Sequence, residues 1–149
     1  MKHIHIVIKL QSIFRGHMAR RNISLILKTR RADSRYFTLD ESRETVSGSK
    51  AYDPNAKREQ RAIYTFNSGA TYEGEWVGGF RDGNGTQKWS DGAIYTGQWN
   101  HNRAQGKGKF IHIDGDVYEG DWVNDKANGY GVYNHVDGAI YEGQWIDDL

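Results

Sequence analysis

The second half of the chain alternates aromatic and polar positions in a pattern that recurs every 23 residues. The phrase Tyr-x-Gly-x-Trp begins at Tyr72 and returns in strict register at Tyr95, Tyr118 and Tyr141. With strand geometry, the Tyr, Gly and Trp of each phrase point to one face, and intervening residues such as Glu73 point to the other. The pattern therefore predicts tandem strands with one aromatic face, and it moves the search for function from a pocket to a surface.

Glycine follows the same period. Fourteen of the 18 glycines fall into four columns spaced by 23 residues, and such positions favour glycine where the backbone needs positive φ or a neighbour comes close. We expect an aromatic side chain of the adjacent repeat to lie over the notch left by Gly74 and its equivalents, each ring pair adding about 0.5–1.5 kcal/mol. The Asp-Gly pairs at 91–92, 114–115 and 137–138 are typical of tight hairpin turns.

The first 35 residues have a different pattern. They hold nine Lys or Arg residues and one acid, a net charge of +8, whereas residues 36–149 hold eleven basic and eighteen acidic residues, a net charge of −7. Leu10, Phe14 and Met18 recur at helical spacing. The pattern predicts a basic amphipathic helix over residues 1–32, tied to an acidic sheet, so the two segments have separate partners or contact each other.

Residues 33–60 show neither helical nor strand period. They are polar, of mixed charge, and contain the only proline, Pro54. They predict a flexible or extended linker. The alternative is that Tyr36, Phe37 and other scattered apolar residues let the segment follow a partner's surface as a strap.

The repeating phrase, the Gly-x-Gly pair nine and eleven residues past its first glycine, and the Asp-Gly pair together resemble the MORN repeat. Three full copies run from Tyr72 to Ile140, a fourth is cut short after Trp145, and Ile63 to Gly69 resembles the tail strand of a partial earlier copy. The resemblance implies a mainly β fold at residues 61–149: an elongated single-layer antiparallel sheet of tandem 23-residue β-hairpin repeats.

Residues 10–23 resemble the IQ motif at each of its defined positions. The resemblance implies a helix bound by calmodulin or another EF-hand light chain, usually without a requirement for calcium. Its apolar side chains suit a Met-lined channel, and its arginines would face an acidic lobe. The residues expected to contact the EF-hand protein are Leu10, Gln11, Ile13, Phe14, Arg15, Gly16, Met18, Arg20, Arg21 and Ile23. Other interpretations of this segment are a mitochondrial presequence, a helix on an anionic membrane, or a helix packed on a neighbouring helix.

A single-layer sheet has no second layer to cover the outer side of its rows of aromatic residues. The aromatic face is therefore expected to be a core along the stack and also a candidate site for a protein partner. Its residues are Tyr72, Trp76, Tyr95, Trp99, Tyr118, Trp122, Tyr141 and Trp145. The 23-residue column of Phe66, Trp89, His112 and His135 makes the histidines flat-ring substitutes, so no metal site is expected there.

Little in the sequence points to catalysis. The chain has no cysteine, so it forms no disulfide, and it has no Gly-rich loop followed by Lys-Ser or Lys-Thr. The acidic residues recur outward along the strands and do not form an acid–base pair. We expect no enzyme activity and no cofactor. Nucleic-acid binding is not expected either, because the acidic sheet repels phosphates.

The residues and the two resemblances together predict a non-enzymatic scaffold adaptor. Its sheet would dock a structural protein of a large cytoskeletal assembly, and its helix would bind an EF-hand protein. Resemblance to small MORN proteins implies a cytoplasmic location in the ciliary or flagellar axoneme, for example in a radial spoke. The alternative is a membrane-associated adaptor that binds anionic phospholipid, which the −7 charge of residues 36–149 opposes. We also expect the strand edge at Tyr141 to Trp145 to pair with a partner strand or a second copy.

Overall fold

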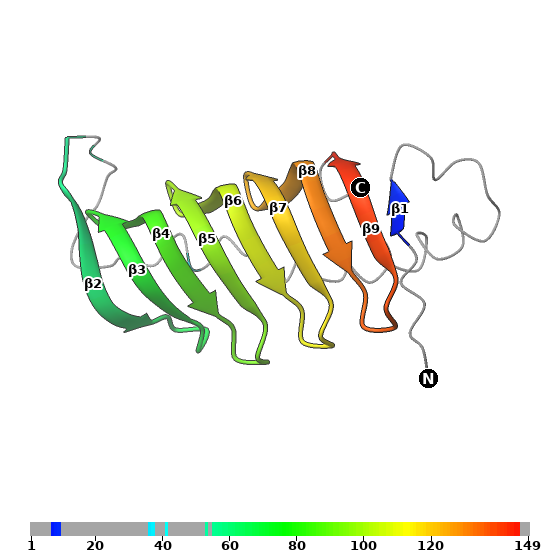
Figure 1. Cartoon of the computed structure of the whole chain (residues 1–149). Coiled ribbons are helices and arrows are strands. Elements are labelled where there is room, and N and C mark those ends of the chain that lie inside the picture. Colours follow the sequence, from blue (N-terminus) through cyan, green and yellow to red (C-terminus); the bar gives the residue numbers. More distant parts are fainter. Residues whose placement is uncertain (1–6, 10–35, 38–40, 42–52, 54, 147–149) are drawn as a thin grey trace.

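The computed structural model describes residues 7–9, 36–37, 41, 53 and 55–146. They include nine strands in one unclosed sheet, in the order β1-β9-β8-β7-β6-β5-β4-β3-β2 (Figure 1). All neighbours from β2 to β9 are antiparallel, which confirms the predicted mainly β, single-layer fold. The strands are β1 (Val7–Lys9), β2 (Arg58–Thr65), β3 (Thr71–Val77), β4 (Phe80–Lys88), β5 (Ile94–Asn100), β6 (Arg103–Ile111), β7 (Val117–Val123), β8 (Lys126–Asn134) and β9 (Ile140–Trp145).

Each 23-residue copy forms one β-hairpin. The Tyr-x-Gly-x-Trp phrase forms the first strand, and the Gly-x-Gly pair lies in the second, so that Gly74 pairs with Gly85 across the first full hairpin. Strand β9 is the first strand of the fourth copy. Strand β2 takes the place of a tail strand beside β3. Because β2 begins at Arg58, the predicted end of the linker at residue 60 lies inside a strand.

Two kinds of turn join the strands. Within the second full copy, β5 and β6 are joined by His101 and Asn102, with φ of 49° and 68°. Both values lie in the left-handed region that a two-residue type I′ turn needs. Between copies, residues 89–93 form a longer loop in which the Gly92 amide donates to the Trp89 carbonyl at 3.0 Å. The Asp-Gly pairs thus lie where strands turn, but in these longer loops and not in the tight turns predicted for them. The two-residue turns within the copies were not predicted.

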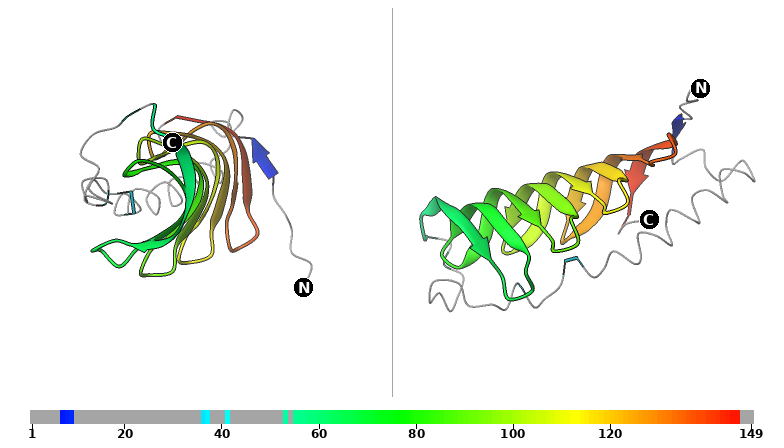
Figure 2. Two further views of the ribbon diagram at one scale, coloured as in Figure 1. Left: turned by 90° about the vertical axis from the view of Figure 1, so that its left-hand side faces the viewer. Right: turned by 90° about the horizontal axis from the view of Figure 1, so that it is seen from below.

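The aromatic residues of the repeated phrase form the core. The sheet is curved, with the segment at residues 36–37 in its hollow (Figure 2). The aromatic residues lie on this concave face, because the Phe37 ring contacts Tyr95 and Trp122. Residues between them, such as Glu73 and Glu119, are exposed on the opposite face, as the alternation predicts. All eight residues predicted for the aromatic face are at most 3% exposed: Tyr72, Trp76, Tyr95, Trp99, Tyr118, Trp122, Tyr141 and Trp145.

A ring contact and a hydrogen bond couple each copy to the next. The Tyr72 and Trp99 rings lie 5.4 Å apart at 88°, and Trp99 Nε1 donates to the Gly85 carbonyl at 3.1 Å. The same joint recurs between Tyr95 and Trp122, whose rings lie 5.1 Å apart at 83°. The edge-to-face packing predicted between repeats is therefore present.

The glycine notch lies elsewhere than predicted. A Cβ on Gly108 would lie 2.3 Å from Tyr95 Oη, so the Tyr95 ring covers a glycine of its own hairpin, not one of the adjacent copy. Gly97, the glycine of the phrase, is instead crowded by backbone, at 2.5 Å from the Lys107 carbonyl oxygen. The ring takes this position because its hydroxyl donates to the Gln98 carbonyl at 2.9 Å, three residues ahead on the same strand.

The buried tyrosines predict a loss of stability in alkali. Burial raises the pKa of Tyr72 and of Tyr95 above the usual value of 10.0. The folded state therefore binds these protons more tightly than the unfolded chain does. Stability from this source is fully present below pH 10 and is lost as the pH rises above it. Arg81 opposes this trend, because burial lowers its pKa to about 10, so the folded state releases its proton before the unfolded chain does.

The two tyrosines lower stability above pH 10, and the one arginine raises it. Their combined effect is a loss, so we expect the free energy of unfolding to fall as the pH rises above about 10. Urea unfolding followed by tryptophan fluorescence at pH 8, 10 and 11 measures this. Tyr95→Phe removes one titrating group and is expected to flatten the fall. A free energy of unfolding that increased between pH 10 and 11 would contradict the expectation.

The structure corrects the prediction for the N-terminal segment at residues 7–9. Val7–Lys9 forms a strand, and it pairs in parallel with Ile140–Glu142 of β9 (Figure 1). A helix was predicted over residues 1–32, so it is wrong for these three residues, where β-branched side chains favour a strand. The rest of that helix, including the ten predicted EF-hand contacts at 10–23, lies outside the described residues.

The strand edge at β9 is also partnered differently than predicted. We expected another chain to pair with Tyr141 to Trp145, whereas β1 of the same chain pairs with the first residues of β9. Within the described part of the chain, no helix is both long and apolar enough to cross a bilayer.

Candidate protein-binding face

Three residues from the predicted linker lie on the concave face of the sheet. We call Tyr36, Phe37 and Glu41 the strap. Figure 2 shows the short cyan segment at residues 36–37 in the hollow of the curved sheet. Tyr36 is 2% exposed and Glu41 is 5% exposed. These positions therefore do not form the flexible linker, and they fit the alternative of a strap along a surface, which here is the sheet of the same chain. The reason is that they find ring and polar partners on the aromatic face.

Tyr36 is held at both ends of its side chain and by its backbone. Its ring lies 5.2 Å from that of Trp89 and 5.5 Å from that of Phe110. The Tyr36 hydroxyl donates to Asp91 Oδ2 at 2.5 Å, and the Tyr36 carbonyl accepts from Trp89 Nε1 at 2.7 Å. This combination of a ring and two hydrogen bonds fixes the position of the strap along the sheet.

Phe37 contacts rings from more than one copy. Its ring lies 5.1 Å from Trp89, 5.8 Å from Tyr95 and 5.7 Å from Trp122. These contacts run from the loop after β4, through β5, to β7. The aromatic face therefore holds a segment of the same chain. Its binding of a partner protein stays a prediction.

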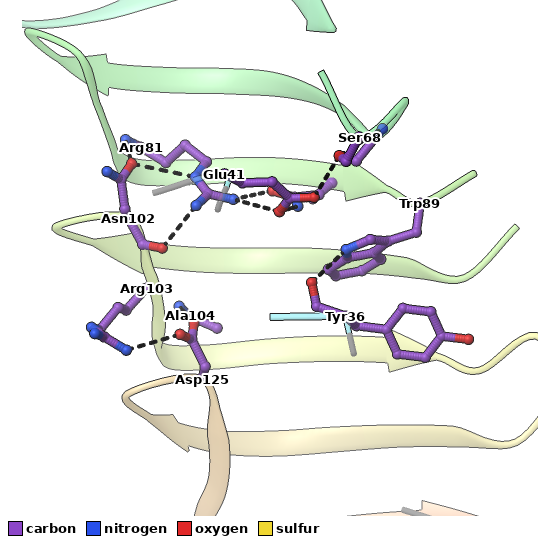
Figure 3. Close-up of polar contacts among 11 residues, drawn as sticks. Tyr36, Glu41, Ser68, Arg81, Trp89, Asn102, Arg103, Ala104 and Asp125 are labelled. Carbon is purple, nitrogen blue, oxygen red and sulfur yellow. Dashed lines mark hydrogen bonds and ion pairs between the residues drawn. The ribbon is translucent and has the colours of Figure 1, made fainter. Parts of the chain in front are cut away.

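Glu41 meets a polar cluster at the first full copy (Figure 3). Its carboxylate accepts from Gln87 Nε2 at 2.6 Å and from Ser68 Oγ at 2.9 Å. Arg81 lies 3.9 Å away as the ion-pair partner. The direction from Tyr36 to Glu41 runs against the order of the repeats, from β6 towards β3.

Arg81 is a buried cation, only 2% exposed. Its guanidinium lies 4.6 Å from the centre of the Trp99 ring and 5.2 Å from that of Phe66, and it donates to the Asn102 carbonyl at 3.1 Å. Burial lowers the pKa of Arg81 to about 10, and the nearby Glu41 carboxylate acts against this change. Because a buried charge is costly unless it is paired, the cluster favours a carboxylate at this place.

Three departures from the repeat pattern mark the place of the strap on the sheet, although they were not used to predict it. Arg81, Gln87 and Trp89 stand where the next copy has other side chains. Each of the three contacts the strap, Arg81 and Gln87 through Glu41, and Trp89 through Tyr36. The corresponding residues one repeat later are Ala104, Phe110 and His112.

The histidines of the 23-residue column lie at the loops between copies. The His112 ring lies 5.9 Å from that of Tyr36 at 82°, a flat-ring contact of the predicted kind. Its Nδ1 lies 2.7 Å from Asp114, and His135 Nδ1 lies 3.0 Å from Asp137. Among the described residues, no group of three or more His, Cys, Asp or Glu side chains is arranged to hold a metal ion.

Two tryptophans of the core provide a matched test of the joint between copies. Trp122 Nε1 donates to the Gly108 carbonyl at 3.1 Å. Trp76 Nε1 is buried and makes no hydrogen bond within the described residues. We expect Trp122→Phe to lower the free energy of unfolding by about 1 kcal/mol more than Trp76→Phe does, because only the former leaves a carbonyl without its donor.

Chemical denaturation of the two variants, followed by far-ultraviolet circular dichroism, measures the difference. Equal losses would mean that the hydrogen bond between copies contributes no net stability. A larger loss for Trp76→Phe would reverse the expected order.

The fold and this face define a class of protein: a single-layer sheet of tandem β-hairpins that holds polypeptide on a concave aromatic face. The MORN repeat profile matches residues 72–94, 95–117, 118–140 and 141–149. The chain belongs to the MORN-repeat family. The IQ calmodulin-binding motif matches residues 4–23, a range that includes β1. No curated protein matches the chain.

Both families are binding modules and not enzymes, and together they indicate a protein-interaction adaptor. The match at residues 4–23 supports calmodulin or another EF-hand protein as one partner.

Proposed function

We propose that the chain is a non-enzymatic scaffold adaptor of a cytoskeletal assembly, with two sites for two kinds of protein. The sheet docks a structural protein, and residues 4–23 bind calmodulin or an EF-hand light chain. The observation that carries the proposal is the seated strap. Rings, a backbone carbonyl and a carboxylate of a short polypeptide segment all find partners on the concave face.

The charge distribution supports separate partners for the two ends. Residues 1–35 carry a net charge of +8, which suits the acidic lobes of EF-hand proteins. Residues 36–149 carry a net charge of −7, which disfavours an anionic membrane as the target of the sheet. A cytoplasmic location in the ciliary or flagellar axoneme, in a structure such as the radial spoke, is the setting we propose for such an adaptor.

Binding of calmodulin to the full chain tests the first site. Isothermal titration calorimetry is performed with calcium and again with a calcium chelator. We expect binding in at least one condition, and its loss in Phe14→Glu/Met18→Glu, because charge on the apolar side of the motif opposes entry into a hydrophobic channel. Ser12→Ala lies within the same motif and is the matched control. Failure of the wild-type chain to bind in both conditions would remove the EF-hand partner from the proposal.

Localisation and co-purification test the second site. A tagged full chain in ciliated cells is expected along the axoneme and is expected to recover structural proteins of the axoneme after detergent extraction. Flotation of the chain with phosphoinositide vesicles, combined with absence from the axoneme, would favour a membrane adaptor instead.

A further inference from the structure

The polar cluster around Glu41 is a carboxylate-binding site that the sheet builds without help from the strap. Asn102 orients Arg81, accepting from its backbone amide at 2.8 Å and from its Nε at 3.3 Å. Gln87 is fully buried and accepts from Arg81 NH1 with its side-chain oxygen, which leaves its amide nitrogen to donate to a carboxylate. A cation fixed by its own sheet, with two neutral donors beside it, is a preorganised anion site.

The aromatic part of the site lies beside this cluster. Trp89 contacts both aromatic rings of the strap and donates its Nε1 hydrogen to the Tyr36 carbonyl. Any polypeptide that presents a carbonyl between two neighbouring rings can accept this bond. The Tyr36 hydroxyl donates a further hydrogen bond to Asp91. The site therefore favours a tyrosine over a phenylalanine at the position of Tyr36.

The strap is attached to the site through a tether and is not a strand of the sheet. Residues 42–57 separate Glu41 from the start of β2 at Arg58. A segment that belongs to the same chain as its site can have an effective concentration of the order of 1 mM. A tethered segment with that advantage excludes an equivalent free segment unless the free segment is more abundant or binds more tightly.

We propose that the concave face between β3 and β7 is a recognition site for a partner segment with two adjacent aromatic residues and a carboxylate four residues after the second. The strap is the intramolecular competitor for that site. This inference rests on the proposed function, because it names the chemistry of the segment by which the structural partner docks. The partner displaces Tyr36, Phe37 and Glu41, and it gains the contacts that they give up.

A peptide of residues 33–44, labelled with fluorescein, is the probe. Its binding is measured by fluorescence anisotropy to the full wild-type chain and to Tyr36→Ala/Phe37→Ala/Glu41→Ala. We expect the triple variant to bind the peptide about 10 to 100 times more tightly than the wild-type chain, because the internal competitor is gone. Peptides with Glu41→Gln or Phe37→Ala are expected to bind the triple variant about tenfold more weakly, through loss of the charged hydrogen bonds or of the ring contacts.

Three outcomes would overturn the inference. The wild-type chain and the triple variant could bind the peptide equally, or the triple variant could fail to bind it. The Glu41→Gln peptide could bind as well as the parent peptide, which would remove the carboxylate site. A wild-type dimer seen by light scattering, and lost in the triple variant, would show that a second copy supplies the strap and would overturn its role as an intramolecular competitor.

Two further measurements keep the test decisive. If the circular dichroism of the triple variant shows loss of the sheet, Glu41→Ala carries the same comparison, because it retains both aromatic residues of the strap. Calmodulin binding through residues 4–23 is measured on the same samples. A triple variant that binds calmodulin but not the peptide rejects this inference and leaves the EF-hand part of the proposed function intact.

Discussion

Gly108→Ala is expected to lower the free energy of unfolding by about 3 kcal/mol or more. The new methyl group would lie 2.3 Å from Tyr95 Oη and 2.6 Å from two ring carbons, far inside contact distance. Tyr95 cannot move aside, because it is fully buried and its ring lies 5.1 Å from both Trp99 and Trp122. Overpacking of a core usually costs about 1–3 kcal/mol. Because the Tyr95 ring is packed between two tryptophan rings, we expect the cost at Gly108 to reach or exceed the top of this range.

Gly92→Ala is the matched control for this substitution. Gly92 has a φ of 103°, and nothing lies within 4 Å of an added Cβ, so its substitution tests backbone strain without a clash. Such strain costs roughly 1–2 kcal/mol. Thermal and urea unfolding of both variants compares the two effects. A loss for Gly108→Ala no larger than that for Gly92→Ala would mean that the tyrosine ring yields, and that close approach is not the reason for glycine at 108.

A double-mutant cycle identifies the ring as the cause. Tyr95→Ala alone is expected to cost about 3–5 kcal/mol through the cavity it leaves. If the methyl group at 108 clashes only with this ring, the double variant should be destabilised by less than the sum of the two single changes. Strict additivity would place the clash elsewhere.

The fold of residues 61–149 could be predicted from the sequence because the two-residue and 23-residue periods indicate the same aromatic face. The period of two within each phrase places Tyr118 and Trp122 on one face, and the 23-residue period places the same face in the next copy. Which glycine each ring covers could not be predicted, because it depends on a side-chain to backbone hydrogen bond from Tyr118 Oη to the Asp121 carbonyl. The two-residue turn at Asn124 and Asp125 was missed because neither residue is glycine, although Asn and Asp tolerate positive φ.

The strap could not be predicted from periodicity, because it has none. Its place on the sheet depends on pairs far apart in sequence, such as Glu41 with Gln87 and Tyr36 with Asp91. The sequence does mark the place where the strap docks, through a break in the repeat. Gln87 stands at a 23-residue position that otherwise holds Tyr64, Phe110 and Tyr133. The polar residue is explained by its partner, because Gln87 donates to the Glu41 carboxylate, which lies outside the repeats.

Arg81→Ala is expected to cost about 3–5 kcal/mol of unfolding free energy. The repeat pattern alone would call the change harmless, because Ala104 and Ala127 occupy the same position in the next two copies. The structure leads to the opposite expectation. Removing Arg81 takes the cation away from a Glu41 carboxylate that is 4% exposed, and it leaves a void between Phe66 and Trp99. Loss of one partner of a buried ion pair is strongly destabilising because the other charge remains without compensation.

Arg103→Ala provides the control, since Arg103 pairs with Asp125 at 3.2 Å but is 43% exposed. Exposed ion pairs contribute about 1 kcal/mol or less. Glu41→Ala added to Arg81→Ala is expected to restore part of the loss, because no orphaned carboxylate then remains. Urea unfolding of the four chains followed by tryptophan fluorescence measures these differences. If Arg81→Ala cost no more than Arg103→Ala, the strap would not be anchored through Arg81. Alanine would then be as stable at position 81 as it is at positions 104 and 127.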